Sequence, residues 1–355
     1  MHLFSPPATT FADQMLCWYD EHRRILPWRE NPLPYHVWLS EIMLQQTQVQ
    51  TVIPYFTRFI AALPTISDLA EVELTQLHKL WEGLGYYSRA DRLREAAQLL
   101  VATNNGLLPE TYNELIKLPG IGPYTAGAIA SIAFGERVCA VDGNVLRILS
   151  RITAYDGPIN VASTAKPLKE LAQSLVPGHR PGDFNQSLMD LGANVCSANG
   201  TPHCERCPVK EHCKAQQQEL TWLLPVKKAK KPRSIENHTI VIITSGSQVW
   251  IHQRPAKQLL AGLWEFLDLP EQLSQEEVLN HTKTRGLSPV SVSDFGCAKH
   301  LFTHKEWHMH GWHITLDTPQ PIDDGIWVDV SALSSTYAMA GALSSYRTKL
   351  FETLL

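Results

Sequence analysis

The feature of this 355-residue sequence that most restricts its fold is a group of four cysteines close together in the chain. Their spacing is Cys196-x7-Cys204-x2-Cys207-x5-Cys213. Four thiolates this close along the chain can enclose one metal centre. A structural zinc site usually has two C-x2-C pairs separated by a longer loop, and this segment has one such pair. The spacing therefore favours a [4Fe–4S] cluster and leaves zinc as the alternative.

The rest of the composition is that of a globular protein. Hydrophobic residues make up 44% of the chain and charged residues 19%, which excludes a largely disordered protein. An odd number of cysteines argues against a disulfide framework, and we expect Cys17, Cys139 and Cys297 to be buried packing residues. The sequence shows neither a membrane-spanning apolar stretch nor a signal or transit peptide pattern. We therefore expect a cytoplasmic protein that does not associate with membranes.

A change in the hydrophobic pattern after residue 225 predicts two domains. Residues 1–225 show helical spacing of apolar side chains, for example between Tyr35 and Thr47. Residues 226–234 are basic and proline-rich, and are interpreted as a linker. Residues 235–355 contain strand-like and helical runs together. The strand-like runs are 239–244, 249–252, 310–316 and 326–330, and the helical runs lie near 274–285 and 340–354. The predicted fold is a mainly α N-terminal part followed by an α+β C-terminal domain.

The charge distribution indicates where a polyanion could bind. The net charge is −4, and the excess of acidic side chains lies after residue 232. This total argues against a protein that binds nucleic acid by charge alone, but a DNA enzyme needs only a local basic face. We expect such a face in the first two thirds of the chain or in the basic linker, although a solvated linker is the simpler interpretation.

The run from Leu118 to Ala128, L-P-G-I-G-P-Y-T-A-G-A, joins two helical segments. Gly120 and Gly122 permit a tight turn with exposed backbone amides, and Pro123 suits the first turn of the following helix. Free amides at a helix N-terminus can bind a DNA phosphate. The run predicts a helix-hairpin-helix motif, with an ordinary interhelical turn as the alternative. Farther on, Asp142-Gly143-Asn144 could be a helix N-cap without further function.

The order of hairpin, aspartate and four cysteines resembles the endonuclease III superfamily of DNA base-excision glycosylases. Three further segments, Leu26–Arg29, Trp38–Val49 and Trp81–Arg89, resemble the MutY-type adenine DNA glycosylases within it. The resemblance implies a six-helix-barrel-type module and an iron–sulfur module, with cluster loop 196–213, in residues 1–225. It implies a MutT-like (Nudix-like) recognition domain in residues 235–355. The implied activity is that of a monomeric, monofunctional glycosylase that removes adenine opposite 8-oxoguanine or guanine in duplex DNA.

The resemblance also assigns roles at the reaction centre. Cleavage of an N-glycosidic bond needs a protonated leaving group and a stabilised, oxocarbenium-like sugar. By resemblance, Glu41 protonates N7 of adenine and Asp142 stabilises the sugar cation, while Tyr124 and Asn144 orient these groups. Glu41 must keep a proton near neutral pH, so we expect it in an apolar pocket.

Further positions match residues that contact DNA in the family, where the target base leaves the helix. The positions around the flipped adenine are Trp28, Arg29 and Gln186, and the positions that fill or wedge the base stack are Gln46 and Tyr86. The hairpin contributes Gly120 and Gly122, and the residues that read 8-oxoguanine are Phe302, Thr303 and His304. The resemblance assigns the ligands of the iron–sulfur cluster to Cys196, Cys204, Cys207 and Cys213. A core position is the alternative for Tyr86. The family usually has Phe-Ser-His where this chain has Phe-Thr-His.

Three departures refine the prediction. The segment between Cys196 and Cys204 is one residue longer than usual in the family, which predicts a longer loop that retains all four ligands. Tyr124 stands where bifunctional relatives hold a Schiff-base lysine, and a phenol cannot form an imine. The acidic cluster of a Nudix hydrolase is missing after Gly262, so we expect recognition by this domain without hydrolysis.

Two alternatives remain beside the adenine glycosylase. One is a bifunctional glycosylase/lyase for damaged pyrimidines, against which Tyr124 and the C-terminal domain argue. The other is a non-catalytic iron–sulfur DNA-binding protein, against which the joint presence of Glu41 and Asp142 argues. Five histidines between residues 300 and 313 are interpreted as scattered strand residues, because no accompanying ligands show metal-site spacing.

Overall fold

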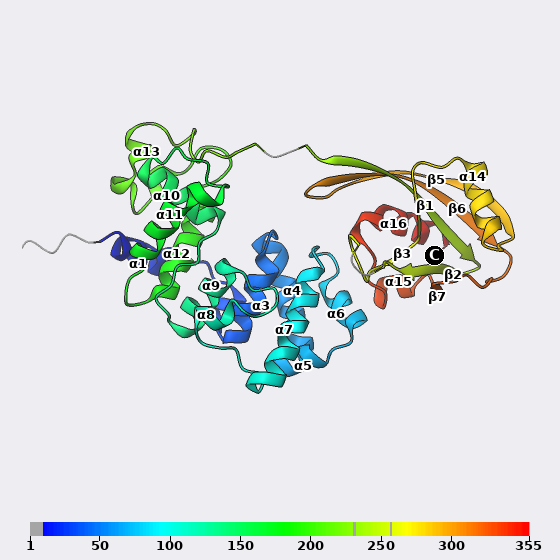
Figure 1. The fold of residues 1–355 in the computed structure, drawn as a ribbon, viewed down its shortest axis with the longest axis horizontal. Helices are drawn as coiled ribbons and strands as arrows, with labels where there is room; N and C mark the ends of the chain where they lie inside the picture. Colours follow the sequence, from blue (N-terminus) through cyan, green and yellow to red (C-terminus); the bar gives the residue numbers. More distant parts are fainter. Residues whose placement is uncertain (1–9, 230–231, 256–257, 355) are drawn as a thin grey trace, which may run out of the picture. The chain divides into compact units, whose positions relative to one another are not determined.

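The computed structural model describes residues 10–229, 232–255 and 258–354, which form two compact units (Figure 1). The first unit consists of residues 1–71 and 91–229, and the second of residues 72–90 and 230–355. Within the predicted linker, Lys230 and Lys231 lie outside the described residues. The linker segment before them is attached to the first unit, because the amide of Lys228 donates to Oδ1 of Asn160 over 2.8 Å.

The first unit is helical, as predicted. Its α-helices are α1 (Phe11–His22), α2 (Pro27–Glu30), α3 (Pro34–Leu44), α4 (Val49–Ala62), α5 (Ile66–Glu71), most of α7 (Ser88–Asn104), α8 (Tyr112–Leu115), α9 (Pro123–Phe134), α10 (Gly143–Thr153), α11 (Ala162–Leu175), α12 (Pro181–Asn194) and α13 (Lys214–Gln217). Two 3-10 turns, η1 (Cys204–Arg206) and η2 (Lys210–His212), lie among the cysteines. Fully buried side chains such as Trp38, Met43 and Phe184 belong to the core of this unit.

Helix α9 organises the unit, because it packs against both α3 and α12. A Cβ atom on Gly182 of α12 would lie 2.6 Å from the carbonyl oxygen of Ser131, so only glycine permits this approach. The hairpin before α9 has the predicted form: Gly120 adopts φ 77°, and Pro123 occupies the first turn after the N-cap Gly122. The close packing brings the N-terminal end of α9 and the middle of α12 to one place.

The second unit contains α6 (Leu74–Trp81) and an α+β part built on a seven-stranded mixed sheet. The strands are β1 (Ser234–Ser245), β2 (Gln248–Gln253), β3 (Trp264–Glu265), β4 (Leu267–Pro270), β5 (Pro289–Leu301), β6 (Lys305–Leu316) and β7 (Gly325–Asp329), in the order β3-β2-β1-β6-β5 with β4 beside β1 and β7 beside β2. Its helices are α14 (Gln275–Thr284), α15 (Ala332–Ser335) and α16 (Ser344–Leu354), with a 3-10 turn η3 (Gly341–Leu343).

Pairing within the sheet places the C-terminal motif. Strands β1 and β6 are parallel from the pair Ser234–Lys305 to the pair Thr244–Thr315, whereas β5 and β6 form an antiparallel hairpin. Apolar side chains of β1, β2 and β6, with Val278 of α14, form a core on one face. Residues 302–304 are therefore the turn of the β5–β6 hairpin.

Several local predictions differ from the structure. The helix expected to reach Thr47 ends at Leu44, because the chain reverses through Gln46 at φ 58°. Strand β5 was absent from the prediction because most of its side chains are exposed, which weakens the hydrophobic alternation. Cys139 is buried as predicted, but the prediction of burial is wrong for Cys17 and Cys297, which are exposed.

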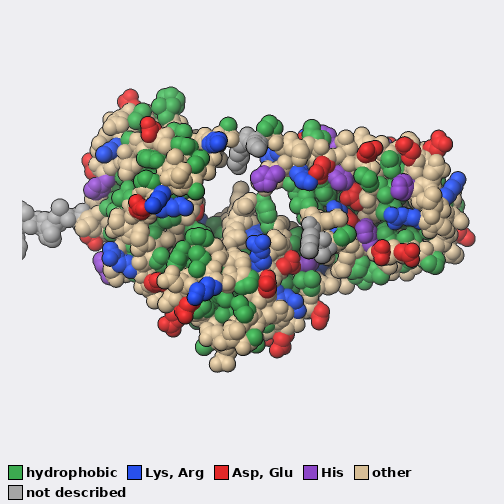
Figure 2. Space-filling model, in the orientation of Figure 1, with side chains coloured by type: hydrophobic (Ala, Val, Ile, Leu, Met, Phe, Trp, Pro, Cys, Tyr) green, Lys and Arg blue, Asp and Glu red, His purple; other side chains and the backbone are tan. Residues whose placement is uncertain are grey.

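The exterior carries both signs of charge. Figure 2 shows Lys and Arg side chains interspersed with Asp and Glu side chains over the face in view. Among the described helices, the structure holds none with the length and apolar character required to cross a bilayer.

Candidate active site

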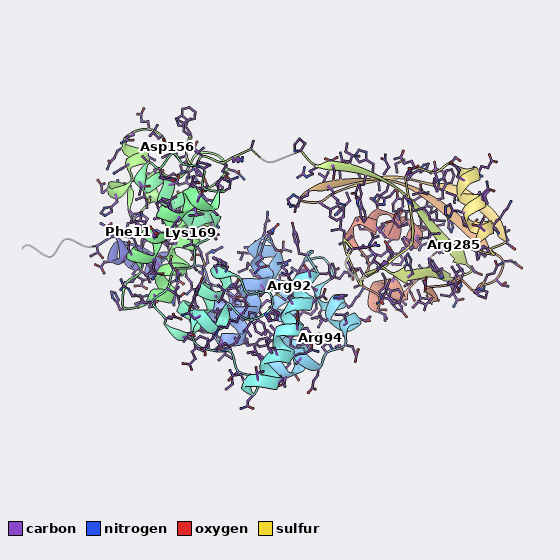
Figure 3. The ribbon with its side chains drawn as sticks, in the orientation of Figure 1. Phe11, Arg92, Arg94, Asp156, Lys169 and Arg285 are labelled. Atoms are coloured by element: carbon purple, nitrogen blue, oxygen red, sulfur yellow. The ribbon has the colours of Figure 1, made fainter. Side chains whose placement is uncertain are left out.

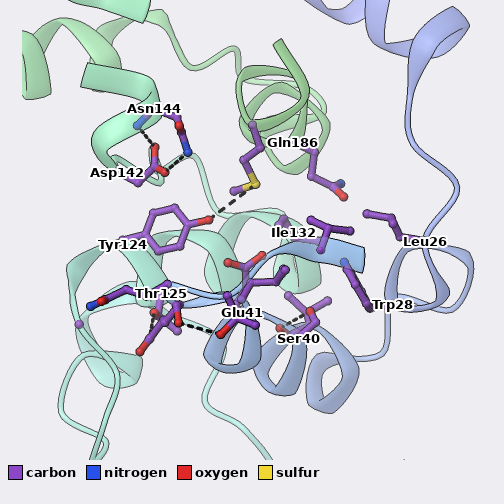
Figure 4. A pocket seen from close by; sticks show the side chains of 18 of the residues that line it. Leu26, Trp28, Ser40, Glu41, Tyr124, Thr125, Ile132, Asp142, Asn144 and Gln186 are labelled. Atoms are coloured by element: carbon purple, nitrogen blue, oxygen red, sulfur yellow. Dashed lines mark hydrogen bonds between the residues drawn. The ribbon is translucent and has the colours of Figure 1, made fainter. Parts of the chain in front are cut away.

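A cavity of about 790 Å³ opens in the first unit between the hairpin, α3, α9 and α12 (Figure 4). Its lining brings together ten of the residues singled out by the sequence. These are Trp28, Arg29, Glu41, Gln46, Gly120, Gly122, Tyr124, Asp142, Asn144 and Gln186. The lining also includes Arg92 of α7, labelled in Figure 3, which packs against Gly120 of the hairpin.

Glu41 lies on α3 with only 5% of its surface exposed. Burial raises the pKa of its carboxyl group to about 7, although the nearby hydroxyl of Tyr124 and the charge of Arg29 act in the opposite direction. Its Oε2 atom is buried and has no hydrogen-bond partner among the residues that the structure describes. The group can therefore carry a proton near neutral pH and has a free oxygen for a ligand.

Asp142 is the N-cap of α10. Its Oδ1 accepts hydrogen bonds of 2.8 Å from the amides of Asn144 and Val145, and its Oδ2 accepts one of 2.6 Å from Nδ2 of Asn144. Asp142 thus caps the helix, and the capped carboxylate also lines the cavity. Three donors fix its orientation.

Asn144 is itself held by a buried arginine. Nη1 of Arg147 donates to Oδ1 of Asn144 over 2.9 Å, while Nε of Arg147 donates to the carbonyl oxygen of Cys196 over 3.0 Å. Nη2 of the same side chain donates to the carbonyl oxygen of Gly192 over 2.8 Å. The side chains around Asp142 are therefore connected to the start of the cysteine segment.

Tyr124 lies in the first turn of α9 and points into the cavity (Figure 4). Its hydroxyl donates to Sδ of Met189 over 3.7 Å and lies beside the carboxyl group of Glu41, whose pKa it lowers. Burial, followed by the charges of Glu41 and Asp142, raises the pKa of this phenol well above its usual value. Tyr124 therefore stays protonated and acts as a hydrogen-bond donor beside the two carboxyl groups.

The wall formed by α2 and α12 carries Trp28, Arg29 and Gln186. Trp28 and Gln186 are buried, and Nη1 and Nη2 of Arg29 donate to Asp190 over 2.7 and 3.0 Å. Sequence reasoning missed Asp190, although it follows Gln186 by one helical turn and must share its face of α12. It also missed other lining residues, namely Arg24, Arg92, Thr125 and Met189.

Gln46 and Tyr86 both adopt left-handed backbone conformations, with φ of 58° and 50°. Such conformations cost energy in residues other than glycine and are found where function requires them. Gln46 is exposed at the cavity, and Tyr86 belongs to the second unit with 46% of its surface exposed. The alternative that Tyr86 is a core aromatic is therefore wrong.

The Phe302-Thr303-His304 turn presents Thr303 and His304 to solvent. Phe302 anchors the turn, because its ring centroid lies 4.9 Å from that of Trp307 and 4.6 Å from that of His300. Within the same unit, the hydroxyl oxygens of Tyr86 and Thr303 are 2.6 Å apart. His304 is therefore exposed to a ligand, while the exposed hydroxyl of Thr303 is shared with Tyr86.

The nearby histidines have other partners. His308 lies 3.3 Å from Glu306, His310 lies 3.1 Å from Asp294, and His313 lies 2.7 Å from Thr244. In the described parts of the chain, no group of three or more His, Cys, Asp or Glu side chains, the four clustered cysteines included, is arranged around a single metal ion.

The four clustered cysteines line a second, smaller cavity together with apolar side chains of α10 and α12. Nη1 of Arg151 donates to Sγ of Cys196 over 3.2 Å. Burial, with smaller contributions from the charges of the neighbouring cysteines, raises the pKa of Cys207 to about 12. Without a cation Cys207 would be a thiol, whereas a bound metal centre would hold it as a thiolate.

The additional residue between Cys196 and Cys204 lies in an exposed loop. Residues 198–201 are exposed, while the amide of His203 donates to the carbonyl oxygen of Val195 over 2.9 Å. Nη1 of Arg151 also donates to the carbonyl oxygen of Ser197 over 2.9 Å. The base of the loop is thus closed, and the additional length lies at its exposed end.

Comparisons with known proteins agree with this geometry. Residues 39–178 match the HhH-GPD superfamily of base excision DNA repair proteins, and residues 238–348 match the NUDIX domain. The chain is 37% identical over 383 residues to the adenine DNA glycosylase of Homo sapiens, covering 90% of this chain and 70% of that protein. It is 35% identical over 301 residues to the adenine DNA glycosylase of Buchnera aphidicola subsp. Acyrthosiphon pisum, covering 84% of this chain and 85% of that protein.

A solved structure of a thermostable thymine-DNA glycosylase is also similar. It is 30% identical in sequence and superposes with a TM-score of 0.54, covering 59% of this chain and 95% of that chain. A helical glycosylase fold, a Nudix-like domain and adenine-specific relatives along most of the sequence lead to one conclusion. The chain belongs to the MutY-type adenine DNA glycosylases of the helix-hairpin-helix base excision repair superfamily.

Proposed function

We propose that this protein is a monofunctional glycosylase that removes adenine paired with 8-oxoguanine or guanine in duplex DNA and leaves the strand uncut. The observation that carries the proposal is the meeting of Glu41 and Asp142, distant in sequence, in one cavity with the hydroxyl of Tyr124. This arrangement supplies an acid for the base and a carboxylate for the sugar, the two groups that N-glycosidic cleavage needs.

Glu41 acts on the leaving group. Its raised pKa, about 7, provides a proton at neutral pH, and its unpartnered Oε2 is available to deliver that proton to N7 of adenine. The hydroxyl of Tyr124 lies beside the same carboxyl group and lowers its pKa. As the glycosidic bond breaks, the bonding electrons leave with the protonated base.

Asp142 acts on the sugar. The positive charge that develops there as adenine departs is stabilised by a carboxylate held in place before the reaction, which saves the cost of reorientation. Asn144 and two backbone amides provide this fixed position. Water then completes the hydrolysis and leaves an abasic site.

The cavity receives a base that has left the helix. Its volume of about 790 Å³ lies within the range of small-molecule pockets, and Trp28, Arg29 and Gln186 offer an apolar face and hydrogen-bonding groups for adenine. Gln46, exposed at the cavity and in a left-handed conformation, is suited to fill the space that the base vacates. The amides of the hairpin at Gly120 and Gly122 are suited to hold a phosphate.

The proposal is tested on duplexes labelled on the adenine strand. Incubation with an A:8-oxoG or A:G duplex should release adenine, and strand breaks should appear only after alkali treatment. Borohydride should trap little protein on DNA, because Tyr124 replaces the lysine of a lyase. A C:8-oxoG duplex is the control and should stay intact. Breaks without alkali, or release of a pyrimidine, would contradict the proposal.

The C-terminal turn is proposed to read the base opposite adenine. The double variant Thr303→Ala/His304→Ala should weaken the preference for A:8-oxoG over A:G by about 1–3 kcal/mol, because the buried polar group of 8-oxoguanine would lose its partners. Binding and single-turnover excision are measured on both duplexes. An unchanged preference, or an equal loss on both duplexes, would show that this turn is not the reader.

We also propose that Cys196, Cys204, Cys207 and Cys213 hold a [4Fe–4S] cluster. They fit this group because all four line one cavity and Arg151 donates to the sulfur of Cys196. A four-iron cluster takes one thiolate at each iron and so needs ligands arranged around a volume larger than one ion. When bound, it would stabilise the fold of residues 196–213.

The cluster is tested by metal analysis of the purified protein. We expect a yellow-brown protein with about four irons per chain. Cys207→Ser should lose most of the iron, whereas the control Cys17→Ser, at an exposed position outside the cavity, should keep it. A colourless, active protein with one zinc per chain would overturn this proposal.

A further inference from the structure

Asp190 of α12 has a side chain with no exposed surface, and it faces two arginines. Nε of Arg24 donates to its Oδ1 over 2.6 Å, and the amide of Arg24 donates to its Oδ2 over 3.2 Å. The two terminal nitrogens of Arg29 donate to Oδ2 and Oδ1 over 2.7 and 3.0 Å. Arg29 thus forms a two-pronged pair that uses both oxygens of one buried carboxylate.

The cavity that Arg24 and Arg29 line contains another buried carboxyl group, that of Glu41. Its Oε2 has no hydrogen-bond partner within the described residues. Arg29 is already close enough for its charge to lower the pKa of Glu41. A guanidinium released from Asp190 would find the free oxygen of Glu41 as its alternative partner.

We propose that Asp190 is a positioning residue whose carboxylate holds Arg24 and Arg29 against α12 and so keeps them from pairing with Glu41. The inference rests on the proposed function, because it explains how Glu41 remains a proton donor in a cavity that contains two arginines. It gives Asp190 no contact with the substrate.

Other charged and titratable groups around Glu41 do not replace Asp190. Tyr124 of α9 is a neutral hydrogen-bond donor, and Asp142 at the start of α10 is occupied by its own three donors. Arg92 of α7 lines the cavity at the exposed hairpin. From α1, the ring centroid of Tyr19 lies 5.8 Å from the guanidinium carbon of Arg29.

The test is the pH dependence of single-turnover excision on an A:8-oxoG duplex. Wild-type activity should fall as the pH rises through the pKa of Glu41. In Asp190→Asn, Arg29 would pair with Glu41, and an opposite charge at that range lowers the pKa of a carboxyl group by about 1–3 units. The alkaline limb of the profile, where the excision rate falls as the pH rises, should therefore move to lower pH in this variant. Asp190→Glu, which retains the charge, should keep the limb near its wild-type position.

Two further variants separate positioning from general damage. Asp183→Asn makes the same chemical change on α12 at a partly exposed pair with Arg180, and should leave the limb unchanged. Asp190→Asn/Arg29→Met removes the displaced cation and should return the limb toward its wild-type position, even if the rate stays low. If Asp190→Asn does not fold, Asp190→Asn/Arg24→Met replaces it, because one fewer arginine is left unpaired.

The outcomes distinguish the two proposals. If the wild type does not release adenine, the proposed function fails. If the wild type is active and the limb of Asp190→Asn does not move, or its rate falls equally at every pH, the positioning role of Asp190 is overturned.

Discussion

Replacing Glu41 by glutamine is expected to lower single-turnover adenine excision by about 10²–10⁴-fold, the usual contribution of general acid catalysis. Glutamine keeps the size and hydrogen bonding of the side chain but has no acidic proton for the leaving base. The free Oε2 and the adjacent hydroxyl of Tyr124 show that Glu41 is placed to interact rather than to pack. Excision and DNA binding are measured together on the A:8-oxoG duplex, and binding should change little.

The pH profile provides the control for this variant. The reactive form of Glu41 is the protonated one, and its pKa is raised to about 7. The wild-type rate should therefore be highest below pH 7 and fall above it, whereas the residual rate of Glu41→Gln should lack this limb. A variant with nearly the wild-type rate would remove Glu41 from the mechanism.

Asp142→Asn is expected to lower excision by about 10²-fold or more, while the stability of the protein changes little. Asparagine is as good an N-cap as aspartate, so α10 keeps its cap, but the negative charge that faces the sugar cation is lost. The measurements are single-turnover excision and the free energy of unfolding in urea.

Asp142→Ala is the matched comparison, because alanine removes both the charge and the cap. It should lose the same catalytic function and, in addition, about 1 kcal/mol of stability. If Asp142→Asn were as destabilised as Asp142→Ala and still excised adenine at the wild-type rate, Asp142 would be a helix cap without a catalytic role.

Features that depend on neighbours in the chain could be predicted from the sequence. The hairpin, the proline at the start of α9 and the cap of α10 follow from the conformational preferences of a few adjacent residues. The division into a helical part and an α+β part follows from the change in hydrophobic period. The candidate roles of Glu41 and Asp142 came from resemblance, because spacing alone does not distinguish a catalytic carboxylate from an exposed one.

Features that depend on packing between distant segments of the chain could not be predicted from the sequence. The limits of α3 and the left-handed turns at Gln46 and Tyr86 depend on where the chain must reverse. The meeting of Glu41, Tyr124 and Asp142 depends on the packing of α3, α9 and the start of α10 into one cavity wall.

Asp190 shows the physical reason most clearly. By sequence it is an acidic residue on an amphipathic helix, which is usually solvated. Its role arises because Gly182 lets α12 approach α9 closely. This packing buries Asp190 beside Arg24 and Arg29, which are far from it in the sequence. Local sequence therefore determined the elements and their caps, whereas burial and charge pairing, which control the pKa of Glu41, were decided only when those elements packed together.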